Sequence, residues 1–207
     1  MKTIAIPADV REQFPDLIDG MYRLRARVFK ERMGWDVKVV QGREIDDFDQ
    51  LPATYILLLT GSSEVSGCAR LLPASGTTML ARAFPQLLST GKLEAHAAMI
   101  ESSRFCVDTT IEEGRGGGAL HQATVTLLAG IIEWSMRNGY SEIVTATDVR
   151  FERILKRAGW PMRRLGEPSR IGNTIAVAGS LSADPTSLAR VRPAGTPSIF
   201  NPMCRAA

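Results

Sequence analysis

Apolar positions recur at helical spacing near the start of the chain. They would share one face of a helix, so the pattern predicts an amphipathic helix over residues 11–33. The apolar positions are Phe14, Leu17, Ile18, Met21, Leu24 and Val28. The opposite face is charged and carries Arg23, Arg27, Lys30 and Glu31.

Apolar segments rich in β-formers then predict strands. ATYILLLTG (residues 53–61) and EVSGCARLLPA (residues 64–74) are joined by a Gly-Ser-Ser sequence, which predicts a hairpin of two antiparallel strands. HAAMIESSRFCVD (residues 96–108) predicts a third strand. A short helix is expected before it, at residues 84–88.

Helices and strands alternate in the second half of the chain. ALHQATVTLLAGIIEWSMRNG (residues 119–139) predicts a long helix that ends at a glycine, and VRFERILKRAG (residues 149–159) predicts a short basic helix that also ends at a glycine. Strands are predicted for SEIVTATD (residues 141–148) and GNTIAVAGSL (residues 172–181). This order predicts an α/β (α+β) sandwich with a mixed, largely antiparallel sheet flanked by helices. The pattern alone does not name the fold.

Composition limits the class of protein. The 44% hydrophobic content of these 207 residues suffices for one core, so we expect a single domain over residues 1–192 and a loose tail over residues 193–207. A net charge of +3 does not by itself indicate a nucleic-acid partner. The three cysteines form no CxxC motif, and no apolar run is long enough for a membrane span or a signal peptide. We therefore expect a cytoplasmic protein with reduced thiols.

Charged residues interrupt the predicted strands. A charged side chain on a strand usually points to solvent, which is the simplest interpretation of each one alone. Arginines and carboxylates could also form a network, because the planar guanidinium pairs bidentately with a carboxylate and stays charged. The six members that we expect in this network are Arg25, Asp46, Asp49, Arg70, Glu101 and Arg104.

These residues belong to a pattern that resembles the acyl-homoserine-lactone synthases, or autoinducer synthases, of bacterial quorum sensing. The densest segments are LRARVFKERMGW, EIDDFD and ESSRFCVD, and the resemblance covers roughly residues 20–180. The residues that carry it are, in order, Arg25, Phe29, Trp35, Asp46, Asp49, Arg70, Glu101 and Arg104. The tail beyond Pro193 lies outside it.

The resemblance implies a fold similar to that of the N-acetyltransferases related to histone acetylases, and a reaction of two substrates. S-adenosylmethionine (SAM) would offer its α-amine to an acyl thioester carried by acyl carrier protein or coenzyme A. The SAM carboxylate would then attack its own γ-carbon, which closes the lactone and releases methylthioadenosine. SAM is consumed in this reaction, so we expect no cofactor and no metal.

The resemblance also implies a site for SAM. Phe29 and Trp35 could contact the adenine or the sulfonium through their ring faces, although core packing is the alternative for both. Arg104 could pair with the SAM carboxylate. The expected SAM-binding residues are Arg25, Phe29, Trp35, Ser103, Arg104 and Phe105. The expected catalytic residues are Asp46, Asp49, Arg70, Glu101 and Arg104.

The acylation step needs a proton acceptor rather than an enzyme nucleophile. An α-amine has a pKa of about 8, so a modest base suffices near neutrality. Glu101 is our candidate base, directly or through a water, and the alternative is that it only holds an arginine in place. Ser102 or Ser103 could hydrogen-bond the ligand. A backbone N–H between Ile100 and Phe105 could stabilise the oxyanion.

An apolar pocket for the acyl chain is expected between the long helix and the SEIVTATD strand. Its candidate residues are Met79, Met99, Leu127, Val144, Thr145, Thr147, Phe151 and Leu155. The resemblance associates threonines at positions 145 and 147 with 3-oxo substrates, but threonine is also an ordinary strand residue. The acyl chain length and its substitution therefore stay open.

Positive charge concentrates between Val149 and Arg170. Seven cations and two anions give this segment a local charge of +5. The predicted helix would dock the acidic surface of acyl carrier protein, through Arg150, Arg153, Lys156 and Arg157. Coenzyme A phosphates could use some of these cations, and a solvated basic face is the remaining alternative.

Three other interpretations of the sequence compete with this one. The segment EEGRGGGAL (residues 112–120) could cradle a phosphate before a helix, or be a surface loop. A generic N-acetyltransferase acting on another amine would leave the Arg25–Phe29–Trp35 pattern unexplained. A nucleic-acid-binding module would use VRFERILKRAGWPMRR, but no helix-turn-helix pattern accompanies it, so we expect no nucleic acid. His96 and His121 have no companions at metal-ligand spacing.

Overall fold

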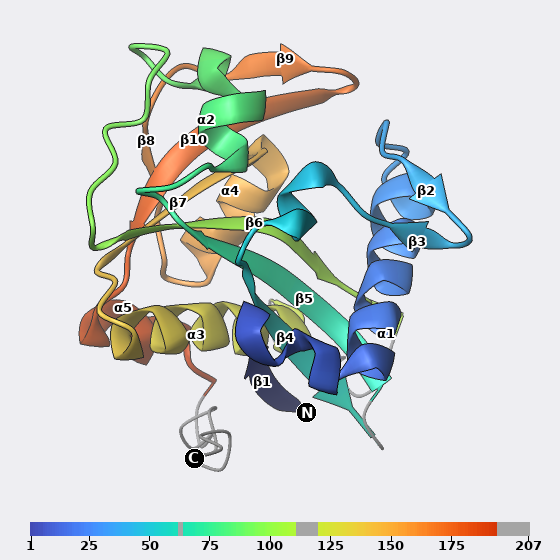
Figure 1. Ribbon diagram of the computed structural model, residues 1–207. Helices are drawn as coiled ribbons and strands as arrows, with labels where there is room; N and C mark the ends of the chain where they lie inside the picture. Colours follow the sequence, from blue (N-terminus) through green and yellow to red (C-terminus); the bar gives the residue numbers. More distant parts are fainter. Residues whose placement is uncertain (62–63, 111–119, 194–207) are drawn as a thin grey trace.

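Figure 1 shows the computed structural model of the chain, which describes residues 1–61, 64–110 and 120–193. Its strands are β1 (Lys2–Ile6), β2 (Val39–Val40), β3 (Arg43–Glu44), β4 (Thr54–Thr60), β5 (Glu64–Pro73), β6 (Met99–Val107), β7 (Glu142–Asp148), β8 (Arg163–Arg164), β9 (Ser169–Ile171) and β10 (Thr174–Ser182). Its helical segments are η1 (Ala8–Gln13), α1 (Pro15–Arg25), η2 (Ala26–Arg32), η3 (Asp47–Gln50), α2 (Met79–Ala83), η4 (Pro85–Leu87), α3 (Gln122–Arg137), α4 (Val149–Arg157) and α5 (Pro185–Val191).

One sheet of eight strands crosses the molecule. Seven strands follow the order β1-β4-β5-β6-β7-β10-β8, and β9 pairs with β10. Within the described residues every pairing in this sheet is antiparallel except that of β6 with β7. The predicted fold class, a mixed and largely antiparallel sheet flanked by helices, is confirmed.

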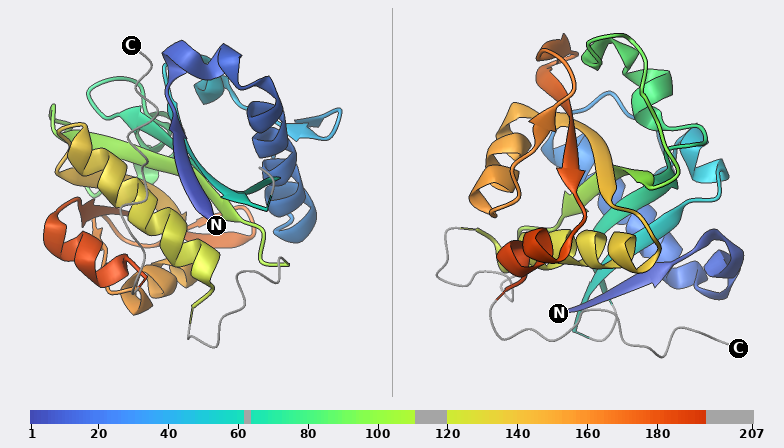
Figure 2. Two further views of the ribbon diagram at one scale, coloured as in Figure 1. Left: turned by 90° about the horizontal axis from the view of Figure 1, so that it is seen from below. Right: turned by 90° about the vertical axis from the view of Figure 1, so that its left-hand side faces the viewer.

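Helices cover both faces of the sheet. Helix α1 packs on β5 and β6 from one side, and α3 packs on β1, β4 and β5 from the other. Figure 2 shows these two helices on opposite sides of the strands. We call the two sides the α1 face and the α3 face. Segments α2 and η4 contact β6 and β10, while α5 packs beside α3.

Alternation along the central strands divides the core between these faces. Ile100 on β6 and Ile143 on β7 pack in the apolar cluster that contains α3. Val144, one residue further along β7, packs in a separate cluster with Leu80 of α2. Because successive side chains on a strand point to opposite faces, Glu101 lies on the same face as Val144, its partner in the β6–β7 pairing.

The predicted first helix is wrong in its continuity. Residues 11–33 form the end of η1, then α1, and then the seven-residue π-helix η2. Pro15 begins α1, because proline lacks the N–H that a helix interior needs and restricts the residue before it to non-helical angles. Phe14 accordingly has φ −126° and ψ 50°.

Other predicted elements are confirmed with small shifts. The hairpin is β4–β5, the third strand is β6, and the last two strands are β7 and β10. The glycines that follow α3 and α4 have φ of +81° and +80°, the left-handed angles that let glycine end a helix. The short helix expected at residues 84–88 is instead α2 followed by the 3-10 turn η4. Strand β1, helix α5 and the short strands were not predicted.

Two expectations concern the ends of the chain and the membrane. The tail predicted over residues 193–207 falls outside the described residues except for Pro193, so its looseness stays a prediction. Among the described helices, none combines the length and the apolar character that a membrane span requires.

Candidate functional site

Three arginines and three carboxylates form a buried group of ion pairs on the α1 face. We call this group the ion-pair cluster, and its members are Arg25, Glu44, Asp46, Asp49, Arg70 and Arg104. They come from the end of α1, from β3, from the η3 turn and from strands β5 and β6. Five of them were predicted from the sequence.

Asp49 is the centre of the cluster. Arg25 donates to both of its carboxylate oxygens, at 2.8 and 2.9 Å, and Arg70 donates to Oδ1 at 2.8 Å. The hydroxyl of Tyr55 donates to the same Oδ1 at 2.7 Å, and the backbone N–H of Asp46 donates to Oδ2 at 2.8 Å. Burial raises the pKa of Asp49, but the hydrogen bonds and charges of the two arginines outweigh it and hold that pKa well below its usual value.

The third carboxylate of the cluster is Glu44, so the prediction of Glu101 in this place is wrong. Glu44 accepts from Arg25 Nε at 2.5 Å and from Arg104 Nε at 3.2 Å. The sequence shows Glu44 among neighbouring carboxylates. It does not show which of them turns inward, because that depends on the short β2–β3 hairpin.

Glu101 lies beside the cluster and makes different contacts. Its two oxygens accept from the backbone N–H groups of Leu80 at 2.5 Å and Met79 at 2.9 Å, at the start of α2. The alternative that Glu101 holds an arginine in place is therefore not what its hydrogen bonds show. Burial raises the pKa of Glu101, against the lowering effect of the two N–H groups. A raised pKa makes the carboxylate a stronger proton acceptor.

Only two members of the ion-pair cluster reach the surface. The side chain of Asp46 is 18% exposed and that of Arg104 is 9% exposed, whereas those of the other four are at most 1% exposed. Arg104 Nη2 lies 2.7 Å from Asp46 Oδ2. Asp46 also lines a shallow cavity of about 260 Å³ under the β2–β3 hairpin. A ligand would therefore meet Asp46 and Arg104, with the buried ion pairs behind them.

A β-bulge aims Arg104 at this site. Residues Cys68 and Cys106 pair across β5 and β6, as do Arg70 and Ser103, so β6 has one more residue than β5 between these pairs. Arg104 takes up the difference with φ +54°, a left-handed angle that is uncommon for a residue other than glycine. The extra residue puts Ser103 and Arg104 on the same face, where Ser103 Oγ accepts from Arg70 Nε at 3.2 Å.

The two aromatic residues stack next to the cluster. The rings of Phe29 and Trp35 lie 5.1 Å apart at an interplanar angle of 2°, and the Arg104 guanidinium lies 5.7 Å from the centre of the Phe29 ring. Phe29 is buried in the core cluster under α1, as the core-packing alternative expects. Trp35 is half-buried, so its ring is the one that remains available to a ligand.

The predicted acyl-chain residues are divided by the sheet. Leu127, Phe151 and Leu155 pack in the core cluster on the α3 face, where the rings of Phe105 and Phe151 lie 4.7 Å apart at an interplanar angle of 47°. Met99 and Val144 pack in the cluster on the other face. Met79 lies apart with Phe48, and its sulfur is 3.3 Å from Arg104 Nη1. The half-buried Thr145 and Thr147 pair with Gly179 and Val177 of β10.

Strands β6 and β7 lie side by side in the sheet, between these two faces, and are paired over only part of their length. They pair only from Met99 to Glu101, and no β7 residue pairs with β6 beyond that point. The strands therefore part beside Glu101, and the later N–H and C=O groups of β6 have no ladder partner on β7. Phe105 and Thr145 lie beyond the point where the strands part.

The basic helix is exposed as predicted. The side chains of Arg150, Arg153, Lys156 and Arg157 are all on the surface of α4. Arg164 of β8 pairs with Glu152 through two contacts of 2.7 Å, which ties β8 to this helix. Asp148 caps the helix by accepting from the N–H groups of Arg150 and Phe151.

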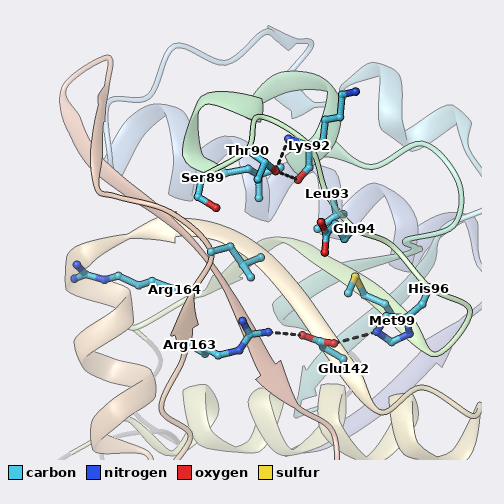
Figure 3. A pocket seen from close by; sticks show the side chains of 12 residues that line it. Ser89, Thr90, Lys92, Leu93, Glu94, His96, Met99, Glu142, Arg163 and Arg164 are labelled. Carbon is cyan, nitrogen blue, oxygen red and sulfur yellow. Dashed lines mark hydrogen bonds and ion pairs between the residues drawn. The ribbon is translucent and has the colours of Figure 1, made fainter.

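A larger cavity of about 420 Å³ lies elsewhere, between the residues 88–99 segment, the start of β7, and β8 (Figure 3). Glu142 at its floor contacts His96 Nε2 at 3.0 Å and Arg163 at 3.3 Å. None of the predicted site residues except Met99 lines it. Among the described residues, no three His, Cys, Asp or Glu side chains are arranged so that they could hold a metal ion together. Residues 112–119 of the EEGRGGGAL segment lie outside the described residues, so the phosphate-loop alternative stays untested.

Tyr55 contacts the ion-pair cluster through Asp49, and sequence analysis missed it as a functional residue. Its alternating position in ATYILLLTG marks it only as a strand residue. The hydrogen bond to Asp49 depends on how the η3 turn folds back over β4, which no local pattern signals.

Comparison with known proteins gives three results. The family model described as autoinducer synthase matches residues 10–191. An acyl-homoserine-lactone synthase of Rhizobium radiobacter is 60% identical over 200 residues, which cover 97% of this chain and 94% of that protein. The solved structures of BjaI, a CoA-dependent acyl-homoserine lactone synthase, with SAM and isopentyl-CoA or with MTA, have a TM-score of 0.82 at 27% identity and cover 96% of this chain and 91% of BjaI.

A more distant structure supports the fold alone. A putative N-acetyltransferase from Lactobacillus plantarum has a TM-score of 0.56 at 17% identity, and the match covers 88% of this chain and 99% of that protein. The expected similarity to the N-acetyltransferase fold is confirmed.

Proposed function

This chain belongs to the autoinducer synthase family, and we propose that SAM binds at its ion-pair cluster, with Arg104, Asp46 and Trp35 as the groups that touch it. The chain is an acyl-homoserine-lactone synthase. It transfers an acyl group from a thioester to the α-amine of SAM, and lactone formation releases methylthioadenosine (MTA).

The proposed location of SAM rests on one observation, which is that only Asp46 and Arg104 of the ion-pair cluster reach the surface. Arg104 can donate to the SAM carboxylate, since its guanidinium is held by Glu44 and Asp46 and still reaches the surface. Asp46 adds a negative charge near the sulfonium and ammonium groups. Trp35 offers a half-buried ring to the adenine or to the sulfonium, and a desolvated contact of the second kind contributes about 1–2 kcal/mol.

The acyl thioester approaches where β6 and β7 part. The amine nitrogen attacks the thioester carbonyl carbon, and the tetrahedral intermediate collapses by breaking the carbon–sulfur bond and releasing the thiolate. A backbone N–H of β6 beyond Glu101 has no β7 partner and is available to the oxyanion. The acyl chain then lies against Phe105, Phe151 and Leu155 on the α3 face.

Glu101 accepts the proton of the attacking amine, directly or through a water. Its raised pKa and its place beside the parting strands support this role. In the second step the SAM carboxylate oxygen attacks the γ-carbon, and the carbon–sulfur bond of the sulfonium breaks as MTA leaves. Both steps use only the two substrates, so the reaction needs no resident cofactor.

Acyl carrier protein is the donor that the basic face of α4 favours. The four exposed cations belong to α4, which directly follows β7 and packs against it, and β7 is the strand from which β6 parts beyond Glu101. Such a face attracts an acidic protein and holds it through charge-assisted contacts. Coenzyme A is the alternative donor.

A reaction with purified protein tests the function. The chain is incubated with SAM and with acyl groups of several lengths, each on acyl carrier protein or on coenzyme A, and the products are identified by mass spectrometry. We expect an N-acyl-homoserine lactone and MTA in equal amounts, with the carrier-bound thioester used at lower concentration. Amide without lactone, or no consumption of SAM, would contradict the proposal.

A further inference from the structure

We infer that Arg11 and Tyr55 are positioning residues for the SAM site, because both hydrogen-bond to Asp49 and so hold the loop that carries Asp46 and Asp49. The inference rests on the proposed place of SAM at the ion-pair cluster. It concerns two residues that are not members of that cluster and that both hydrogen-bond to Asp49.

Arg11 fixes the backbone of the carboxylate loop. It belongs to η1, near the start of the chain, and its guanidinium donates to the carbonyl oxygens of Asp49 at 2.8 Å, Ala53 at 3.2 Å and Leu51 at 3.4 Å. The Asp49 carbonyl belongs to η3, and the carbonyls of Leu51 and Ala53 belong to the segment that joins η3 to β4 and is not part of a strand. One arginine therefore replaces the hydrogen-bond ladder that would otherwise hold this segment.

Tyr55 fixes the side chain of Asp49, whose backbone carbonyl Arg11 holds. It is fully buried on β4, and its hydroxyl donates to Asp49 Oδ1 at 2.7 Å. The Arg11 guanidinium lies 4.8 Å from the centre of the Tyr55 ring, so the two residues also hold each other. Burial and the charge of Asp49 raise the pKa of Tyr55, which keeps the hydroxyl protonated and able to donate.

A chain of direct contacts connects this pair to the ligand-facing residues. Asp49 Oδ2 accepts from the backbone N–H of Asp46, and the Asp46 carboxylate lies 2.7 Å from Arg104 Nη2. A change in the orientation of Asp49 therefore moves Asp46 and then Arg104. Because these last two are the exposed members of the cluster, the loss should appear as weaker SAM binding and not only as lower stability.

The experiment measures SAM affinity by calorimetry, the KM for the acyl thioester and the melting temperature of each variant. Tyr55→Phe removes only the hydroxyl, and Arg11→Met keeps the aliphatic stem. We expect Tyr55→Phe to weaken SAM binding about three- to tenfold, the usual effect of one lost hydrogen bond, and Arg11→Met to weaken it at least as much because it removes three, while the KM for the thioester changes little. Arg11→Lys should recover part of the affinity, since lysine keeps the charge and donates to fewer carbonyls.

Two matched variants serve as controls. Tyr140→Phe removes a hydroxyl from a tyrosine that stacks on Trp134 of α3, and Arg23→Met removes an exposed arginine that pairs with Asp19 on α1. Both should bind SAM as the wild type does. The Arg11→Met/Tyr55→Phe double variant should lose less affinity than the sum of the single losses, because both act through Asp49.

The outcomes separate this inference from the proposed function. Wild-type protein that binds SAM, with folded Tyr55→Phe and Arg11→Met variants of equal affinity, would overturn the inference alone and make both residues purely structural. A wild type that does not bind SAM would overturn the proposed site and the inference with it.

Discussion

At the scale of single residues, the acidic groups of this site differ in what balances their burial. Asp49 is surrounded by two guanidinium groups and a hydroxyl, so its ionised form is favoured. Glu101 has two backbone N–H donors and no ion pair among the described contacts, so burial dominates and raises its pKa above the ordinary value. The first group suits a structural charge and the second suits proton transfer.

Glu101→Gln should lower the acylation rate about 100-fold or more, with SAM binding nearly unchanged, because the variant keeps the shape but cannot accept a proton. The wild-type rate should rise with pH up to the Glu101 pKa, which lies above its ordinary value of 4.5, and the variant should lose this dependence. Single-turnover measurements across pH test this. Normal turnover in the variant with a lowered melting temperature would assign Glu101 to holding α2 alone.

Asp49→Asn should lower the free energy of unfolding by about 3–5 kcal/mol at neutral pH, because it leaves Arg25 and Arg70 buried with less negative charge. The native pKa of Asp49 is depressed, so its stabilising effect is present above its ordinary value of 3.8 and is lost as pH falls below it. Denaturant unfolding between pH 7 and pH 3 should show the difference from wild type shrinking toward low pH. A difference that stays constant with pH would contradict the ionic explanation.

Sequence analysis found most of the site at this scale, and the misses have a physical origin. Arg25, Asp49 and Arg70 could be predicted because only mutual pairing makes such charges stable in a core. That Glu44 and not Glu101 is the third carboxylate of the cluster could not be predicted, because it depends on the bulge at Arg104 and on the β2–β3 hairpin. Arg11 acts through backbone carbonyls, which leave no trace in the pattern of side chains.

At the scale of elements, periodicity located the long segments and missed the short ones. The hairpin, α3 and α4 have apolar patterns that continue for several turns or alternations. Strand β1 has five residues and β8 has two, too few for a period to be recognised. The π-helix η2 was missed because a helical pattern of apolar residues does not distinguish the turns of an α-helix from the wider turns of a π-helix. The acyl-chain residues were grouped by sequence, whereas alternation on β7 divides them between two faces.

Gly166→Ala should destabilise the fold by about 1–3 kcal/mol, because overpacking forces the surrounding backbone to shift. A Cβ at this position would lie 2.4 Å from the Leu87 carbonyl oxygen and 2.9 Å from the Ser89 nitrogen. Thermal and denaturant unfolding measure the effect. Gly76→Ala is the control, since its Cβ would meet nothing closer than the Pro73 oxygen at 3.6 Å. Equal stability of both variants would mean that the contact between η4 and the β8–β9 connection is loose.

At the scale of the whole molecule, charge is distributed unevenly around the sheet. The cations of the ion-pair cluster are neutralised in the core, whereas four cations of α4 stay exposed. In the proposed function, the buried ion pairs hold the residues that bind SAM, and the exposed cations of α4 attract acyl carrier protein over a range that added salt shortens.

Arg150→Glu with Arg157→Glu should raise the KM for acyl carrier protein thioesters about tenfold or more, while the KM for SAM hardly changes. Added salt should weaken use of the carrier protein by the wild type in the same direction. Lys2→Glu with Lys92→Glu changes the net charge equally at exposed positions outside α4 and should have little effect. If the reversed α4 face uses carrier-bound chains as well as the wild type does at low salt, that face is solvated surface and not a docking site.

The most direct test of the central claim, that SAM binds beside Trp35 at the ion-pair cluster, is a SAM titration followed by tryptophan fluorescence. Wild type is compared with Trp35→Phe, which retains Trp134 and Trp160. We predict a saturable fluorescence change in the wild type that is absent from the variant, although the variant still makes lactone. The same fluorescence change in both proteins would contradict the account, because SAM would then bind near another tryptophan.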